Sequence, residues 1–198
     1  MDIRVVFALL VIMSFGGVLL YEILRRTGQR ESPERKAGRI GEVLVSDMIK
    51  EVLNDDDHIL TNIRIRADGK EAELGNLIIN SYGLFIIEVK NYNGSLYGDE
   101  DDYEWNKVKI NEAGYSYVSQ VNNPIKQVKR QIYVLSRFLK QHGFTIWIEG
   151  FVFLVMGNSP VASPYVLHNE EEIDEVIHRG DRIAIDNDSM DRIIKLLR

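Results

Sequence analysis

Residues 73–90 read Glu-Leu-Gly-Asn-Leu-Ile-Ile-Asn-Ser-Tyr-Gly-Leu-Phe-Ile-Ile-Glu-Val-Lys. Two apolar runs lie on either side of the turn-forming residues Asn-Ser-Tyr-Gly, and this pattern predicts an antiparallel hairpin in which Asn80 pairs with Gly83. Residues 84–87 are apolar without interruption, as in a strand that is buried on both faces. We therefore expect the second strand of the hairpin to lie inside a sheet around which the rest of the chain is arranged.

The hairpin ends in charged residues. The predicted register sets Gly75 opposite Glu88 and Glu73 opposite Lys90, with all four on one face of the sheet. A carboxylate at position 75 would lie about 5 Å from Glu88 at Cβ, close enough for both to bind a hard cation such as Mg²⁺. Two interpretations fit this spacing: a metal site that lacks one ligand, or a solvated strand end with a Glu73–Lys90 ion pair worth about 0.2–1 kcal/mol.

The composition excludes several kinds of site. The chain has 198 residues, 45% of them hydrophobic and none of them cysteine, which suits one domain and an accessory segment but excludes disulfides, thiol catalysis and cysteine-ligated zinc. The four histidines lack metal-binding spacing, so we expect them on the surface or in loops. The net charge of −6 argues against a generally basic nucleic-acid-binding surface, but local basic patches can still bind phosphate.

The N-terminal segment predicts a membrane anchor. Residues 5–21 contain no charged residue and are long enough to cross a bilayer as a helix, so we assign residues 1–25 to a single-pass anchor and 26–35 to a polar linker. A signal peptide fits less well, because no small-residue cleavage site follows. Basic residues cluster after the span, whereas Arg4 alone precedes it, which predicts a domain in the cytoplasm at the cell membrane. These basic residues are Arg25, Arg26, Arg30, Arg35, Lys36 and Arg39.

Hydrophobic periodicity outlines the other elements. Residues 36–53 predict a helix whose apolar stripe comprises Ile40, Val43, Leu44, Met48 and Val52. An Asn-Asn-Pro sequence before residue 125 predicts the start of a second helix that ends near residue 141. We expect strands at 59–66, 95–97, 103–110, 115–118, 147–156, 165–167 and 182–185, and further helices at 170–178 and 189–197.

The second helix is the most basic element of the expected domain. Its basic residues lie off the apolar stripe, and they include Lys126, Lys129 and Arg130. Such a run is usually a solvated helix face, but it can also contact phosphates. The acidic run at 99–102 is interpreted as a solvated loop.

Several motifs occur in order within residues 36–155: Gly38-Arg-Ile-Gly-Glu42, Phe85-Ile-Ile-Glu88-Val-Lys90-Asn-Tyr-Asn-Gly94, Glu104-Trp105 and Asn123-Pro124-Ile-Lys-Gln127. Together they resemble the NERD (nuclease-related domain) family. The resemblance implies an α/β fold with a restriction-endonuclease-like, or PD-(D/E)xK, core: a helix, a three-strand mixed sheet, a helix and a strand, preceded here by one transmembrane helix. Residues 156–198 would form a C-terminal extension packed on this domain.

The resemblance also implies a site. Glu88 would be a metal ligand and Lys90 the water-positioning base or electrostatic stabiliser, with Glu42 and Gln127 as supporting groups. The implied cofactor is Mg²⁺ or Mn²⁺. The implied partner is nucleic acid, with DNA as the first candidate, and the basic helix would bind it. Where the family has an aspartate this chain has Gly75, and the neighbouring Glu73 is the candidate substitute ligand.

Two hypotheses follow from these residues. The first is a membrane-anchored nuclease or DNA-processing protein that uses a degraded metal site for phosphodiester hydrolysis. The second is a catalytically inactive nuclease fold retained for binding or scaffolding. Gly75 favours the second hypothesis, while the intact Glu88-Val-Lys90 sequence favours the first.

Overall fold

The structure is a computed structural model that describes residues 32–111, 113–156, 160–180 and 184–198. The chain divides into two compact units, Met1–Lys36 and Ala37–Arg198. The anchor predicted at 5–21 lies outside the described residues, as does part of the strand predicted at 182–185. Over the part of the chain that is described, no helix has the length and apolar character needed to cross a membrane.

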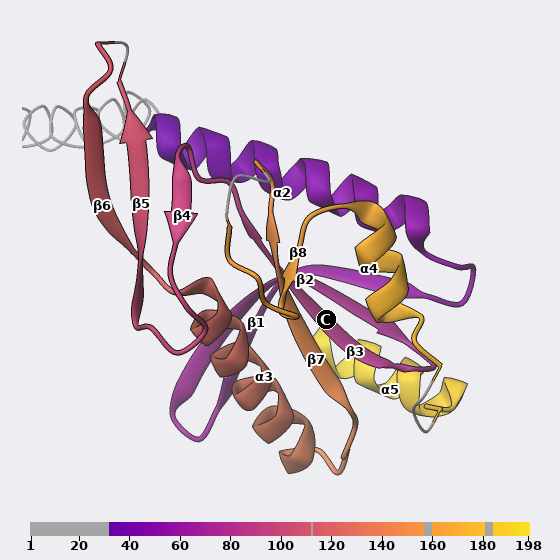
Figure 1. The fold of residues 1–198 in the computed structure, drawn as a ribbon. Helices are drawn as coiled ribbons and strands as arrows, with labels where there is room; N and C mark the ends of the chain where they lie inside the picture. Colours follow the sequence, from indigo (N-terminus) through magenta and orange to yellow (C-terminus); the bar gives the residue numbers. More distant parts are fainter. Residues whose placement is uncertain (1–31, 112, 157–159, 181–183) are drawn as a thin grey trace, which may run out of the picture. The chain divides into compact units, whose positions relative to one another are not determined.

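A five-stranded sheet forms the centre of the domain (Figure 1). Its order is β1-β2-β3-β7-β8; β2 is antiparallel to both β1 and β3, whereas β7 is parallel to β3 and β8 is parallel to β7. The strands are β1 (His58–Ala67), β2 (Lys70–Asn80), β3 (Gly83–Lys90), β7 (Ile148–Leu154) and β8 (Val166–Leu167). The prediction of a mixed α/β fold is confirmed, although the mixed sheet has five strands rather than three.

Helices cover both faces of this sheet because each face is apolar. Helices α3 (Pro124–Gln141) and α5 (Asn187–Leu197) pack on one face, and α2 (Pro33–Val52) and α4 (Glu170–Ile177) pack on the other (Figure 1). A second, three-stranded antiparallel sheet lies between β3 and α3 in the sequence and consists of β4 (Ser95–Tyr97), β5 (Glu104–Ile110) and β6 (Ser116–Asn122). The elements therefore follow the predicted order of a helix, three strands, a helix and a strand, except that this second sheet is inserted before the second helix.

The predicted hairpin is confirmed with its register. Asn80 pairs with Gly83, and the ladder runs to Asn76 opposite Ile87. The turn is stabilised locally, because the Tyr82 amide donates a hydrogen bond of 2.9 Å to Asn80 Oδ1. Strand β3 is buried from Gly83 to Glu88, so it is the inner strand that its apolar run predicted.

The alternation of faces along β2 slips by one residue near Gly75. Ala72 and Leu74 belong to the same buried cluster as Leu77 and Ile79, whereas strict alternation would put the two pairs on opposite faces. The opposing strand β1 is disturbed at the same level, where Asn62 has a left-handed φ of 56° between the pairs Thr61–Asn76 and Ile63–Leu74. The expectation that Glu73 shares a face with Glu88 was therefore wrong.

Helix α2 is also rotated relative to the prediction. Ile40, Val43 and Leu44 of the predicted stripe are 51%, 55% and 45% exposed, and the buried residues of α2 are instead Gly41, Val45 and Ile49. The reason is close packing at Gly41, where an added Cβ would lie 2.8 Å from Asn91 Cβ. The backbone of α2 can approach the end of β3 only through this glycine.

Helix α3 begins where its capping residues predicted. The side chain of Asn123 accepts a hydrogen bond of 2.9 Å from the Ile125 amide and donates to three backbone carbonyls in the acidic loop. Those carbonyls belong to Asp99, Glu100 and Asp102. The loop is thus attached to the start of α3 through its backbone rather than through its carboxylates.

Candidate functional site

The carboxylate of Glu88 lies at the end of β3, facing α3, and is 8% exposed. Three side-chain nitrogens bond it. Lys90 Nζ lies 2.6 Å from Oε1, Gln127 Nε2 donates to Oε1 over 2.7 Å, and Gln131 Nε2 donates to Oε2 over 2.8 Å. The structure therefore brings together Glu88, Lys90 and Gln127, as the family resemblance implied. Both oxygens of the Glu88 carboxylate accept hydrogen bonds from side chains of this protein.

Gln131 belongs to this site but was missed in the sequence. It is 3% exposed, and its amide nitrogen also donates a hydrogen bond of 2.8 Å to the backbone carbonyl of Glu73. Its Oε1 atom is buried and has no hydrogen-bond partner among the residues that the structure describes. Gln127 and Gln131 are four residues apart on one helix face, a spacing that could have identified the pair.

Tyr92 lies close enough to the site for the charges of Lys90 and Glu88 to affect the pKa of its phenol. Burial raises the pKa of the Tyr92 phenol; the positive charge of Lys90 lowers that pKa and the negative charge of Glu88 raises it. The ring also lies under Lys107, whose Nζ is 5.7 Å from the ring centroid. Tyr92 is therefore held as a neutral phenol beside the Glu88–Lys90 pair.

Glu42 is not part of the cluster around Glu88. It is an exposed residue of α2 that lines a surface cavity of about 590 Å³, and Gly75 and Asn76 line the same cavity. Asn76 is oriented by Ser46, whose hydroxyl donates a hydrogen bond of 2.6 Å to Asn76 Oδ1. The structure therefore places Glu42 near position 75 and leaves Glu88 outside the lining of that cavity.

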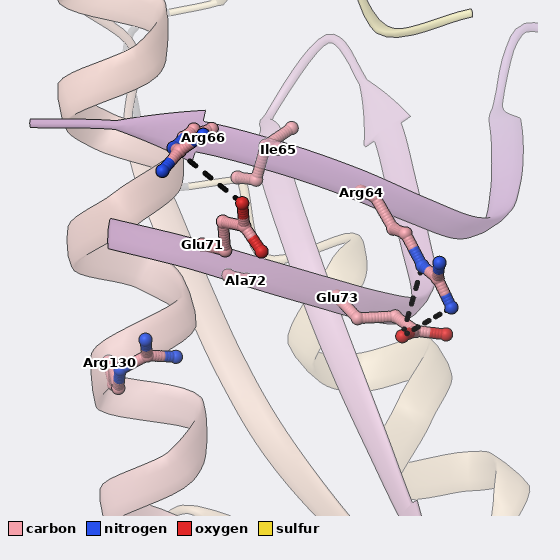
Figure 2. Close-up of a pocket in the computed structure, with 7 residues that line it drawn as sticks. All are labelled: Arg64, Ile65, Arg66, Glu71, Ala72, Glu73 and Arg130. Atoms are coloured by element: carbon pink, nitrogen blue, oxygen red, sulfur yellow. Dashed lines mark hydrogen bonds and ion pairs between the residues drawn. The ribbon is translucent and has the colours of Figure 1, made fainter. Parts of the chain in front are cut away.

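Glu73 bonds Arg64 rather than Lys90. Its carboxylate lies 3.3 Å from both Nε and Nη2 of Arg64, on the neighbouring strand β1, and its side chain is 55% exposed (Figure 2). The predicted Glu73–Lys90 ion pair was wrong, because the slip at Gly75 turns Glu73 to the other face of the sheet. Lys90 pairs with Glu88 instead.

These positions fit a divalent cation poorly. Proteins usually bind Mg²⁺ through one or two carboxylates together with waters and substrate phosphates, and no group of three or more Asp, Glu or His side chains gathers as a possible metal site among the described residues. Glu88 is the one carboxylate here, and the ammonium group of Lys90 already contacts it. The unpartnered Oε1 of Gln131 adds a neutral oxygen but no charge.

The basic residues of α3 lie beside this cluster. Lys126 Nζ is 4.2 Å from the centroid of the Tyr103 ring, and Lys129 Nζ is 4.6 Å from that of Tyr165. Lys129 also lies 3.7 Å from a Glu100 oxygen. Arg130 is exposed, has no ion-pair partner among the described residues, and lines a surface cavity of about 430 Å³ with Arg64 and Arg66 (Figure 2).

A second charged cluster was not expected from the sequence. His178 Nδ1 lies 2.6 Å from Asp174, and Nε2 lies 2.8 Å from the side chain of Asp57, which is 6% exposed. Burial lowers the pKa of His178, but the hydrogen bonds to Asp57 and Asp174 outweigh it and raise the pKa above its ordinary value. Instead of being a simple surface residue, His178 links the α2–β1 loop to the end of α4.

Comparison with known proteins identifies the family of the domain. The chain matches the nuclease-related domain (NERD) family over residues 37–155, and it belongs to that family. It is 26% identical over 105 residues to an uncharacterized protein of Bacillus anthracis, an alignment that covers 52% of this chain and 47% of that protein. The chain thus spans about half the length of this relative.

A solved protein of unknown function, AF1548, is also similar in part. The similarity has a TM-score of 0.32 and 15% sequence identity, and it covers 72% of this chain and 55% of that protein.

Proposed function

We propose that this nuclease-related domain binds nucleic acid through phosphate contacts made by the N-terminal half of α3. Lys126, Lys129 and Arg130 supply the cations, and Arg130 carries the proposal because it is exposed and has no ion-pair partner among the described residues. Phosphate contacts of this kind act on any sequence and weaken steeply with salt. Double-stranded DNA is the first ligand to test.

An exposed aromatic ring supports this surface. Tyr103 is 86% exposed and lies against Lys126. An aromatic ring beside a cation is the combination on which bases of single-stranded nucleic acid stack. The same surface therefore suits duplex backbone and unpaired bases, and competition between duplex and single-stranded DNA will rank the two ligands.

Salt-dependent binding tests the proposal. The parent chain and the triple variant Lys126→Ala/Lys129→Ala/Arg130→Ala are titrated into labelled DNA at several salt concentrations. Since each phosphate contact contributes about 0.9 to the slope of log K against log salt, the variant should lose roughly 2 to 3 units of slope and most of its affinity. The matched control is Lys50→Ala/Lys140→Ala/Lys195→Ala, which removes the same charge from exposed sites elsewhere. Equal losses in both triple variants would show a net-charge effect and contradict the proposal.

Metal-dependent hydrolysis of a phosphodiester is the second candidate function. The convergence of Glu88, Lys90 and Gln127 favours it, as does the order of elements, which fits the restriction-endonuclease-like core implied by the resemblance. The poor donor set around Glu88 argues against it. Incubation of DNA with the parent chain and either Mg²⁺ or Mn²⁺ separates the candidates, because the binding function predicts no cleavage above that of a Glu88→Gln/Lys90→Ala variant.

We also propose that residues 5–21 anchor the chain in the cell membrane with the domain in the cytoplasm. The support is the length of the uncharged run and the basic residues that follow it. The chain has no cysteine, so Gly28→Cys introduces a single thiol. That thiol should resist impermeant reagents in intact cells and react once the cells are opened; ready labelling of intact cells would contradict the orientation.

A further inference from the structure

One edge of strand β6 is not paired with any other strand of the described residues. This strand is the last of the second sheet and pairs with β5 alone within the described part of the chain. Six of its seven residues are exposed, and Val121 is the one that is half-buried. Its sequence, Ser-Tyr-Val-Ser-Gln-Val-Asn, has neither a charged residue nor proline. The backbone donors and acceptors along this edge are therefore open to another strand.

The other sheet edges are protected in ways that β6 is not. The outer strand β1 carries the charged residues Arg64 and Arg66 and is bent at Asn62, where φ is 56°. The remaining edge strands are short, since β8 has two residues and β4 has three. Charge, bends and short length are the usual means by which edge strands avoid pairing. Strand β6 combines full strand length with none of these features.

The sheet face next to this edge is also uncharged toward its tip. Val108 pairs with Val118 and Ile110 pairs with Ser116 across β5 and β6, so these residues share one face. Ile110 is 72% exposed and Val118 is 66% exposed. A strand added to β6 would extend this face and cover part of its apolar surface.

We propose that β6 pairs with the β6 strand of a second copy of this chain, antiparallel and about a two-fold axis at Ser119. Centring on Ser119 aligns all seven residues, sets Val118 opposite Gln120 of the copy, and joins two three-stranded sheets into one of six strands. An uncharged strand meets its own copy without like-charge repulsion, and each copy covers the edge that the other leaves open. A charged peptide would find no opposite charge on this strand.

Disulfide trapping tests the pairing in the full, detergent-solubilised chain. Ser119→Cys places one thiol at the axis, and residues directly opposite in antiparallel strands have the Cα separation that a disulfide needs. The control is Arg64→Cys, at an edge position whose side chain is 81% exposed. Because pairing raises the effective concentration of the thiol, the Ser119→Cys chain should form covalent dimers at least about tenfold faster than the control.

A charge placed on the edge gives the second measurement. Val118→Lys in the Ser119→Cys chain puts two lysines beside the axis, so cross-linking should fall to the rate of the Arg64→Cys control. Fluorescence of the buried Trp105 verifies that the variant is folded. Equal rates for Ser119→Cys and Arg64→Cys would overturn the proposal, because association would then involve random collision or another segment. Cross-linking that survives Val118→Lys would overturn it as well.

Discussion

Two glycines lie in the strands on either side of β3 and differ sharply in what surrounds them. Gly150 of β7 pairs with Ile86 and lies against α3, so that an added Cβ would overlap with Val128 Cγ1. An added Cβ at Gly75 of β2 would have no atom within 4 Å. Packing therefore requires the first glycine and not the second. The family resemblance implies a carboxylate at position 75, and the open space around Gly75 leaves room for one.

Gly150→Ala should have the largest effect on stability. The new methyl group must displace Val128 and then Ile132, whose Cδ1 lies 3.1 Å from the added Cβ. Overpacking of this kind costs about 1–3 kcal/mol in the free energy of unfolding. Urea unfolding followed by Trp105 fluorescence measures the loss. An unchanged midpoint of urea unfolding would show that α3 is not packed tightly on β7, and it would contradict the contrast drawn between Gly150 and Gly75.

Gln131→Leu should have an intermediate effect. Leucine keeps most of the buried volume but removes the donor to Glu88 Oε2 and to the Glu73 carbonyl, and both acceptors lose a hydrogen bond. Leaving such groups unpaired costs about 1–2 kcal/mol. The matched control is Gln127→Leu, because Gln127 is exposed and Lys90 still bonds the Glu88 oxygen that it contacts. If the exposed variant proves the more destabilised of the two, the account of how Glu88 is held is wrong.

Gly75→Ala should have the smallest effect. The site has space for a methyl group, and the φ angle of Gly75 is not in the left-handed region that favours glycine. Alanine restricts the unfolded chain, so the free energy of unfolding should stay level or rise by about 0.4–1 kcal/mol. The same urea experiment detects the change. If Gly75→Ala lowered the free energy of unfolding as much as Gly150→Ala does, the space for a side chain at position 75 would have to be filled by neighbouring atoms.

The sequence was informative where one local pattern determined the structure. The turn at 80–83 implied the register of β2 and β3, and Asn123 before Pro124 implied the start of α3, because hairpin and capping geometry depend on neighbouring residues. Family resemblance then grouped Glu88, Lys90 and Gln127. These predictions needed no knowledge of how distant elements pack.

Tertiary packing accounts for the errors. The slip of faces at Gly75 depends on Asn62 in another strand, so the hairpin alone could not place Glu73. Helix α2 is turned by close packing at Gly41, which its own apolar pattern does not reveal. The same is true of His178, whose partner Asp57 is 121 residues away. Long-range contacts of this kind leave no periodic signal in the sequence.

A calorimetric titration of Mg²⁺ into the parent chain and into Gly75→Asp tests whether the missing carboxylate keeps this site from binding a metal. We predict no saturable binding by the parent, because Lys90 and the two glutamine amides occupy the lone carboxylate of Glu88. The next pair of the hairpin ladder beyond Asn76–Ile87 would set position 75 opposite Glu88. Gly75→Asp should therefore fold normally, because an added Cβ there meets no atom within 4 Å, and it should bind Mg²⁺ and gain metal-dependent cleavage of DNA, which adding Lys90→Ala should remove. Equal Mg²⁺ binding and equal activity in the parent and in Gly75→Asp would contradict this account.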